Sequence, residues 1–170
     1  EVDTHMMKDS EWGAVAYLAQ SRYGRNGAEV NINDSSSYLA GGSADLSTVY
    51  GVNTNQSTTG NSYGVYDMNG STQEFTMAYL GSNNANASSG YNAGTMTGQL
   101  DSRYYDDYTN SSGNVIKGSG VYETSLATSW NSDNATYPIA ATAWFTRGGT
   151  YSGNTASGIF SYIGHAGSAN

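Results

Sequence analysis

The sequence contains no cysteine, a single proline at position 138, and only 6 lysine and arginine residues against 14 acidic ones. Without cysteine there is no disulfide, no thiolate metal site and no thiol nucleophile. The formal charge of −8 argues against a nucleic-acid partner, because phosphate binding depends on clustered basic side chains. No apolar run reaches the length of about 18 residues that a transmembrane helix needs, so the sequence predicts no membrane span.

Small polar residues and aromatics make up much of what is present. Glycine, serine, threonine and asparagine account for 80 of the 170 residues, which predicts many turns and irregular segments. The 15 tyrosines, 3 tryptophans and 3 phenylalanines supply apolar area that disordered chains lack. We therefore expect one loop-rich folded domain over residues 1–170. Because the sequence opens on Glu1 rather than Met, we expect it to be the C-terminal part of a longer chain.

Residues 61–78, with the sequence NSYGVYDMNGSTQEFTMA, contain the most informative pattern. The stretch from Asp67 to Gly70 is typical of a tight turn, and the alternation that follows through Glu74 predicts a strand. Upstream, residues 9–23 predict a helix because Trp12, Val15, Ala16, Ala19 and Tyr23 recur at helical spacing. An aromatic on that stripe is typical of a core residue, so we interpret Trp12 as core. Residues 122–128 are a second helical candidate.

Three stretches, in this order, resemble the formylglycine-generating enzyme family, a branch of the C-type lectin fold. Residues 64–70 followed by Glu74 resemble its G-[LV]-[YW]-D-M-x-G-N-V-x-E-W signature. Residues 10–12 resemble its E-W-E-Y-A helix, and residues 147–150 resemble its R-G-G-S turn. The resemblance covers about residues 6–168. It implies an α+β fold of C-type lectin type, with one clear N-terminal helix and short antiparallel strands.

The same resemblance implies structural roles for the motif residues, which are Trp12, Asp67, Gly70, Glu74, Arg147, Gly148 and Gly149. The glycines allow close backbone packing, and the arginine of the R-G-G-S turn is structural. We expect Arg147 to pair with a buried acid, with Glu74 as the first candidate. The alternative is an arginine on the surface.

Catalysis is not expected. The family oxidises a substrate cysteine with copper held by two cysteines near its C-terminus, and this sequence has none. The two histidines, His5 and His165, lie at opposite ends of the sequence and do not have the spacing of a two-histidine metal site. Neither a nucleophile elbow nor a phosphate-binding glycine motif is present.

Recognition is the expected function, because relatives without the catalytic cysteines serve as receptor-binding or surface-display domains. Tyrosine, serine, glycine and asparagine also dominate antibody paratopes. Residues 151–157 and 161–168 are rich in amino acids that mutated asparagine codons would yield, as in the variable proteins of diversity-generating retroelements. The predicted ligand contacts are Trp144, Tyr151, Asn154, Tyr162 and His165, with Trp130 at the rim or in the core. Replacing Tyr151 and Tyr162 with alanine is expected to abolish binding with little change in melting temperature.

We thus expect a non-enzymatic extracellular or cell-surface domain, on a bacterium or phage, that binds a protein or glycan ligand on another cell or particle. The alternative is a structural subunit or display domain of a pilus-like appendage, self-assembling through an upstream segment. No cofactor is required. Asp101, Asp106 and Asp107 form either a calcium site, as found in the family it resembles, or a solvated acidic turn.

Overall fold

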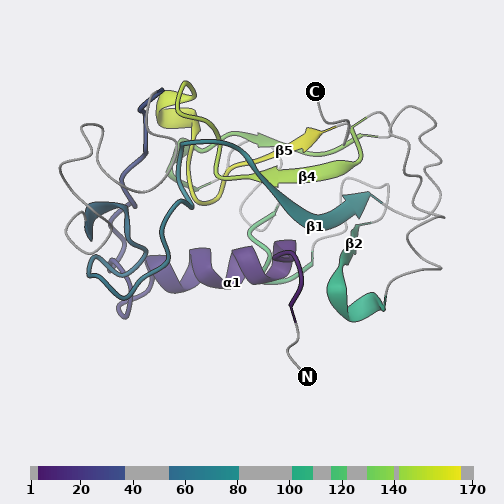
Figure 1. Ribbon diagram of the computed structural model, residues 1–170, viewed down its shortest axis with the longest axis horizontal. Helices are drawn as coiled ribbons and strands as arrows, with labels where there is room; N and C mark the ends of the chain where they lie inside the picture. Colours follow the sequence, from purple (N-terminus) through teal and green to yellow (C-terminus); the bar gives the residue numbers. More distant parts are fainter. Residues whose placement is uncertain are drawn as a thin grey trace.

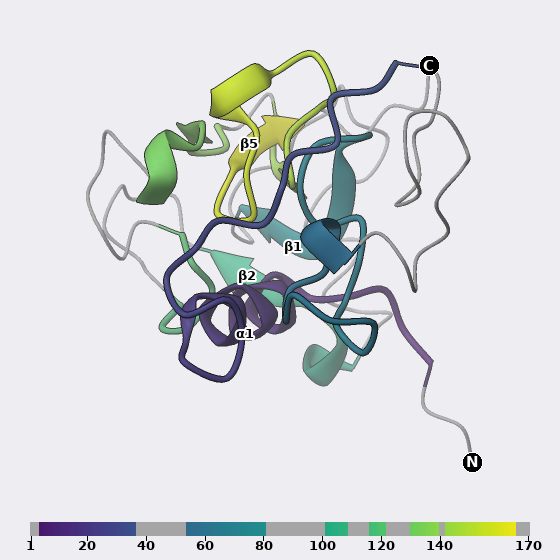
Figure 2. The same ribbon diagram turned by 90° about the vertical axis from the view of Figure 1, so that its left-hand side faces the viewer.

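The computed structural model describes residues 4–36, 54–80, 101–108, 116–121, 130–139 and 142–165. In these residues a single α-helix, α1 (Asp9–Gln20), lies against one face of a five-stranded sheet (Figure 1), and the turned view in Figure 2 places it on the same side. The fold is therefore α+β. The strands are β1 (Glu74–Leu80), β2 (Asp106–Tyr108), β3 (Ala135–Thr136), β4 (Trp144–Arg147) and β5 (Tyr162–His165). Four 3₁₀ turns accompany them: η1 (Thr54–Gln56), η2 (Ser102–Tyr104), η3 (Trp130–Ser132) and η4 (Asn154–Ala156).

The sheet is mixed, with the strand order β2-β1-β4-β5-β3. β4 pairs antiparallel with both β1 and β5, whereas the outer strands β2 and β3 run parallel to their neighbours. The register of β1 against β4 shifts between Phe75 and Tyr79, as expected for a β-bulge. The expectation of short antiparallel strands holds for the centre of the sheet, but not for its two edges.

The predicted N-terminal helix is confirmed, and it begins at Asp9. The Lys8 backbone N–H donates to the Glu11 carboxylate at 2.8 Å, so the first turn is capped as in a capping box. Trp12 is buried on the apolar stripe, as predicted, but Tyr23 is not part of it. The helix ends at Gln20, and Tyr23 is 73% exposed in the turn that follows. The second predicted helix, residues 122–128, lies outside the described residues.

Two clusters of buried apolar side chains form the core. One lies between α1 and the loops that cover it, and consists of Trp12, Ala16, Ala19, Val30, Met68, Ile159 and Phe160. The other lies between the sheet and its flanking segments, and consists of Ala78, Leu80, Tyr108, Val121, Ala143, Phe145 and Tyr162.

The three motif stretches pack together. The Gly70 N–H donates to the Gly148 carbonyl at 2.9 Å, which joins the turn at residues 67–70 to the turn after β4. Both glycines have positive φ, and a side chain at Gly70 would collide with the Asn33 carbonyl. Gly148 lies against the Trp12 ring, whose Nε1 donates to the Ile159 carbonyl at 2.7 Å. Residues far apart in the sequence thus form one compact junction, which we call the motif junction (Trp12, residues 67–70 and residues 147–149).

Arg147 is completely buried, and its acidic partner is Asp9 rather than Glu74. Nη1 of Arg147 lies 3.3 and 3.4 Å from the two Asp9 carboxylate oxygens. Asp9 also accepts hydrogen bonds from the Tyr108 hydroxyl at 2.7 Å and from Thr76 at 3.2 Å. The prediction of a buried acid is therefore confirmed, but the choice of Glu74 is wrong. Glu74 lies opposite Arg147 in the pairing of β1 with β4, but the Glu74 side chain is exposed.

Candidate functional site

Residues 150–157, which we call the tyrosine loop, connect β4 to the segment before β5. The loop is held at three points by hydrogen bonds. The Thr150 N–H donates to Ser157 Oγ at 3.0 Å, Ser157 Oγ donates to the Thr150 carbonyl at 2.6 Å, and the Tyr151 N–H donates to the Ser71 carbonyl at 2.8 Å. Above this base, Tyr151 is 37% exposed and Asn154 is exposed with a positive φ of 50°. The loop therefore presents two of the predicted contacts on a fixed backbone.

Trp130 lies on η3, which packs beside η4 of the tyrosine loop. The Asn134 N–H donates to the Ala156 carbonyl at 2.7 Å and ties the two segments together. The Trp130 ring stands edge-on to the rings of Tyr17 and Phe160, yet it remains 38% exposed. It is thus a rim residue with one edge in the core.

Trp144 and His165 lie at the other end of β4. They are register partners on β4 and β5, so both side chains project from the same face of the sheet. The ring of His165 meets Phe75 edge-on with centroids 4.9 Å apart, and the Trp144 ring lies 6.1 Å from Tyr79. The predicted contacts therefore divide into two groups at opposite ends of β4, rather than forming one surface.

Tyr162 is a core residue, and its assignment as a ligand contact is wrong. Its side chain is 1% exposed and lies with its ring centre 5.8 Å from the Arg147 guanidinium carbon. As a register partner of Arg147 it projects inward from the sheet together with it. The double replacement of Tyr151 and Tyr162 would consequently remove core packing as well as a surface contact.

The three aspartates proposed for calcium are held apart by different partners. Asp101 caps η2 and lies 3.5 Å from Arg103, whereas Asp106 is buried and lies 3.5 Å from Lys8 Nζ. Asp106 and Asp107 are consecutive strand residues, so their side chains project to opposite faces. Across the described residues, no group of three histidine, cysteine, aspartate or glutamate side chains is arranged to hold a metal ion. The geometry lends the calcium prediction no support.

A groove that the sequence did not predict lies beside the motif junction. It has a volume of about 450 Å³ and lies between the N-terminal segment, the turn at residues 65–68 and the start of β1. We call it the methionine groove, and its lining residues are Met6, Met7, Trp12, Val65, Tyr66, Asp67, Met68, Glu74, Phe75 and Thr76. The Met77 N–H donates to the Met7 carbonyl at 2.9 Å, which fixes the N-terminal segment alongside β1.

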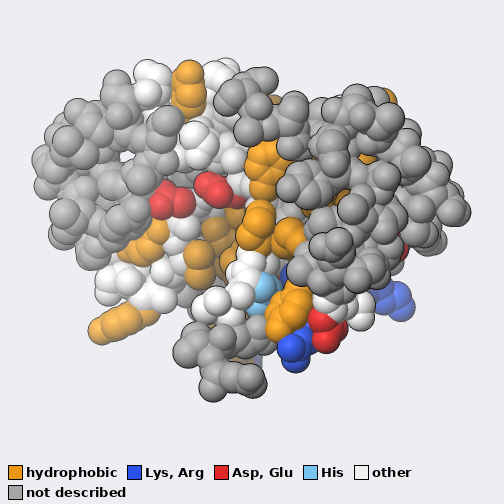
Figure 3. All heavy atoms as spheres, turned by 45° about the vertical axis from the view of Figure 1, so that its right-hand side comes forward, with side chains coloured by type: hydrophobic (Ala, Val, Ile, Leu, Met, Phe, Trp, Pro, Cys, Tyr) orange, Lys and Arg blue, Asp and Glu red, His pale blue; other side chains and the backbone are white. Residues whose placement is uncertain are grey.

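The walls of the methionine groove are unusually apolar for a surface. Met6 is 50% exposed, Met7 37%, Val65 43% and Phe75 42%, so that four of the ten exposed large hydrophobic residues of the described chain meet here. In Figure 3, where the right-hand side of Figure 1 comes forward, hydrophobic side chains form a band with acidic side chains beside it. An exposed apolar patch of this kind is typical of an interaction site.

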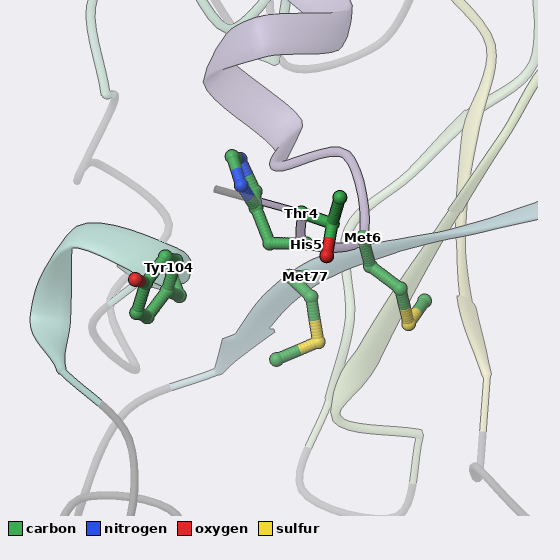
Figure 4. Close-up of a pocket in the computed structure, with 5 residues that line it drawn as sticks. All are labelled: Thr4, His5, Met6, Met77 and Tyr104. Carbon is green, nitrogen blue, oxygen red and sulfur yellow. The ribbon is translucent and has the colours of Figure 1, made fainter. Parts of the chain in front are cut away.

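A second hollow, of about 420 Å³, lies on the other side of Met6. Figure 4 shows that Thr4, His5 and Met6 of the N-terminal segment line it, with Met77 from β1 and Tyr104 from η2 across from them. The His5 imidazole is held by the Glu11 carboxylate, 3.0 Å away, and its ring lies 5.5 Å from the Tyr104 ring. Methionine side chains thus continue from one depression into the next, and methionine adapts its shape readily to different partners.

The acidic side chains of the methionine groove are Asp67 and Glu74. Partial burial, and then the negative charge of Asp67, raise the pKa of Glu74 above its ordinary value of 4.5. Two carboxylates close enough to repel each other lie beside apolar walls, and no basic residue is among those that line the groove. A cation entering the groove would relieve this repulsion.

The methionine positions are the one signal for the groove that the sequence contains. Three of the five methionines, at positions 6, 7 and 68, line it, and Met77 lines the adjacent hollow. Asp67 and Glu74 were assigned structural roles from the resemblance, whereas the structure also places both in the lining of a groove. Their proximity to residues 6–7 depends on long-range packing, which no local pattern reveals.

No family model, curated protein or solved structure matches the chain. The resemblance of the three motif stretches therefore stays a prediction. In the described part of the chain, no helix has the length and apolar character needed to cross a membrane.

Proposed function

We propose that this chain is a non-enzymatic, extracellular recognition domain of C-type lectin type, which binds a protein or glycan through the tyrosine loop and the neighbouring Trp130. The junction of the helix with the two glycine turns supports the fold assignment, because the three stretches that resemble the family's motifs are in contact. The absence of the two copper-binding cysteines from the sequence supports a role without catalysis.

The anchoring of the tyrosine loop is the observation that carries this proposal. Backbone and serine hydrogen bonds fix the loop at Thr150, Tyr151 and Ser157, while the side chains of Tyr151 and Asn154 stay exposed. A fixed backbone loses little conformational entropy on binding, and tyrosine supplies a large contact area with few rotatable bonds. Asparagine beside it offers both a donor and an acceptor to a peptide or a sugar hydroxyl.

The test is a binding screen of the purified protein against arrays of glycans and bacterial surface proteins, run with calcium and with a chelator. For any ligand found, Tyr151→Ala and Asn154→Ala are each expected to weaken binding by about tenfold or more. Tyr63→Ala is the matched control, because Tyr63 is 93% exposed and lies outside the tyrosine loop.

Equal losses in the Tyr63 control and in the loop variants would contradict the proposed surface. A hit on sugar that disappears with chelator would instead direct attention to a calcium-assisted site. If neither array gives a ligand and the protein forms filaments, the alternative of an appendage subunit replaces recognition as the function.

A further inference from the structure

The methionine groove combines exposed apolar walls with two acidic residues. Its walls expose methionine, valine and phenylalanine side chains, and contact of these apolar side chains with water is unfavourable. Its lining also includes two acidic residues, Asp67 and Glu74, and the negative charge of Asp67 is near enough to raise the pKa of Glu74. A fully apolar partner would take these carboxylates out of water, and a fully polar one would leave the apolar walls exposed to water.

From this combination we infer that the methionine groove binds an arginine side chain of a peptide or protein partner, with its aliphatic stem on the methionines and its guanidinium at Asp67 and Glu74. An arginine side chain matches both features, because it has an apolar stem and a cationic end. The planar guanidinium also stacks on aromatic rings, and Tyr66 lines the groove. The volume of about 450 Å³ leaves room for residues that flank the arginine.

The charge of the whole protein favours the same partner. With a formal charge of −8, the chain attracts basic segments from a distance, and the two groove carboxylates then fix the position of the cation. This site is separate from the tyrosine loop, since the two surfaces share no lining residue. The inference therefore stands or falls independently of the proposed function.

The experiment uses a capped hexapeptide of alternating leucine and arginine, and compares it with versions in which lysine or glutamine replaces every arginine. Titration into the intact protein, with carbon-13 labels on the methionine methyl groups, reports both affinity and position. The arginine peptide is expected to bind saturably, with a Kd below about 1 mM. The methyl signals of Met6, Met7 and Met68 should shift during the titration. The lysine version should bind more weakly, because an ammonium group is not planar and cannot stack on an aromatic ring as a guanidinium does.

Variants then separate charge from shape. Glu74→Gln and Asp67→Asn keep the size of each side chain, and asparagine tolerates the positive φ of 63° at position 67. Each is expected to weaken binding of the arginine peptide by about fivefold. Glu29→Gln, which removes the same charge at an exposed residue outside the groove lining, should leave the affinity unchanged.

Several results would overturn the inference. They are the absence of saturable binding, equal affinity for the glutamine or the lysine peptide, and methyl shifts that spare the three groove methionines. Equal affinities of the Glu74→Gln and Glu29→Gln proteins would do the same. The melting temperatures of the variants show whether each is folded, and the two isosteric replacements provide independent readings of one site.

Discussion

Removal of the charge on Asp9 should cost more stability than any other single change of a carboxylate to its amide in the described chain. Asp9 and Arg147 are both 0% exposed, and Asp9 is the only described hydrogen-bond partner of the guanidinium. Asp9→Asn preserves the shape of the side chain but leaves the buried guanidinium without a counter-charge. Loss of one partner of a buried ion pair costs about 3–5 kcal/mol.

Opposing effects within the pair set the size of this cost. Burial raises the pKa of Asp9 above its ordinary value of 3.8, while Arg147 and the Tyr108 hydroxyl oppose the rise. The rings of Trp12 and Tyr162, each with its centre under 6 Å from the Arg147 guanidinium carbon, offer cation–π contacts that remain after the substitution. We therefore expect a loss near the lower end, about 3 kcal/mol, from a total stability of about 5–15 kcal/mol.

The assay is urea unfolding at neutral pH, followed by tryptophan fluorescence, because urea does not screen charges. Arg103→Met is the control, since the Arg103–Asp101 pair is more than half exposed and its loss should cost less than about 1 kcal/mol. The double variant Asp9→Leu with Arg147→Met should recover much of the lost stability, because no isolated charge remains buried. A loss below about 1 kcal/mol for Asp9→Asn would refute the assignment of a buried ionic contact.

Two further predictions follow from burial. Burial raises the pKa of Asp133 to about 7 from its ordinary value of 3.8, so the folded protein holds this proton more tightly than the unfolded chain does. Its contribution to stability should be complete below about pH 4 and should fall by about 4 kcal/mol as the pH rises through 7. In Asp133→Asn this part of the pH dependence should vanish in urea titrations; an unchanged profile would contradict it. Separately, Tyr162→Ala should cost about 3–5 kcal/mol, whereas Tyr151→Ala should stay within about 0.5 kcal/mol. Melting curves of the two variants that coincide would show that Tyr162 does not belong to the core.

Local patterns predicted the elements whose structure is decided locally. The apolar spacing around Trp12 indicated α1, and the glycines at positions 70 and 148 indicated turns, where the structure has positive φ. The partner of Arg147 was not predictable in this way. Asp9 and Arg147 are separated by 138 residues in sequence, and only the packing of α1 beneath the sheet brings them together. Glu74 is the register partner of Arg147 on the adjacent strand, yet it lines the groove instead of pairing with the guanidinium.

The tyrosines illustrate the same limit. The apolar residues Ile159, Phe160 and Ile163 lie near Tyr162 and have no counterpart near Tyr151, but they do not show which face of a strand each side chain takes. The positions of the two tyrosines differ because Tyr162 is on β5 as the register partner of Arg147, whereas Tyr151 follows the glycine turn that ends β4. Burial in this sheet is thus set by register, which depends on pairing between distant strands.

The motif junction connects the two candidate surfaces. Trp12 contributes to the floor of the methionine groove and also lies against Gly148, which begins the turn that leads into the tyrosine loop. Met68 lines the groove, and two residues later Gly70 donates to the Gly148 carbonyl. The residues that resemble a family motif therefore serve as a shared base from which both surfaces project. Substitutions at this base, such as Gly148→Ala, would disturb binding at both surfaces at once, whereas Tyr151→Ala and Glu74→Gln should each affect only one of them.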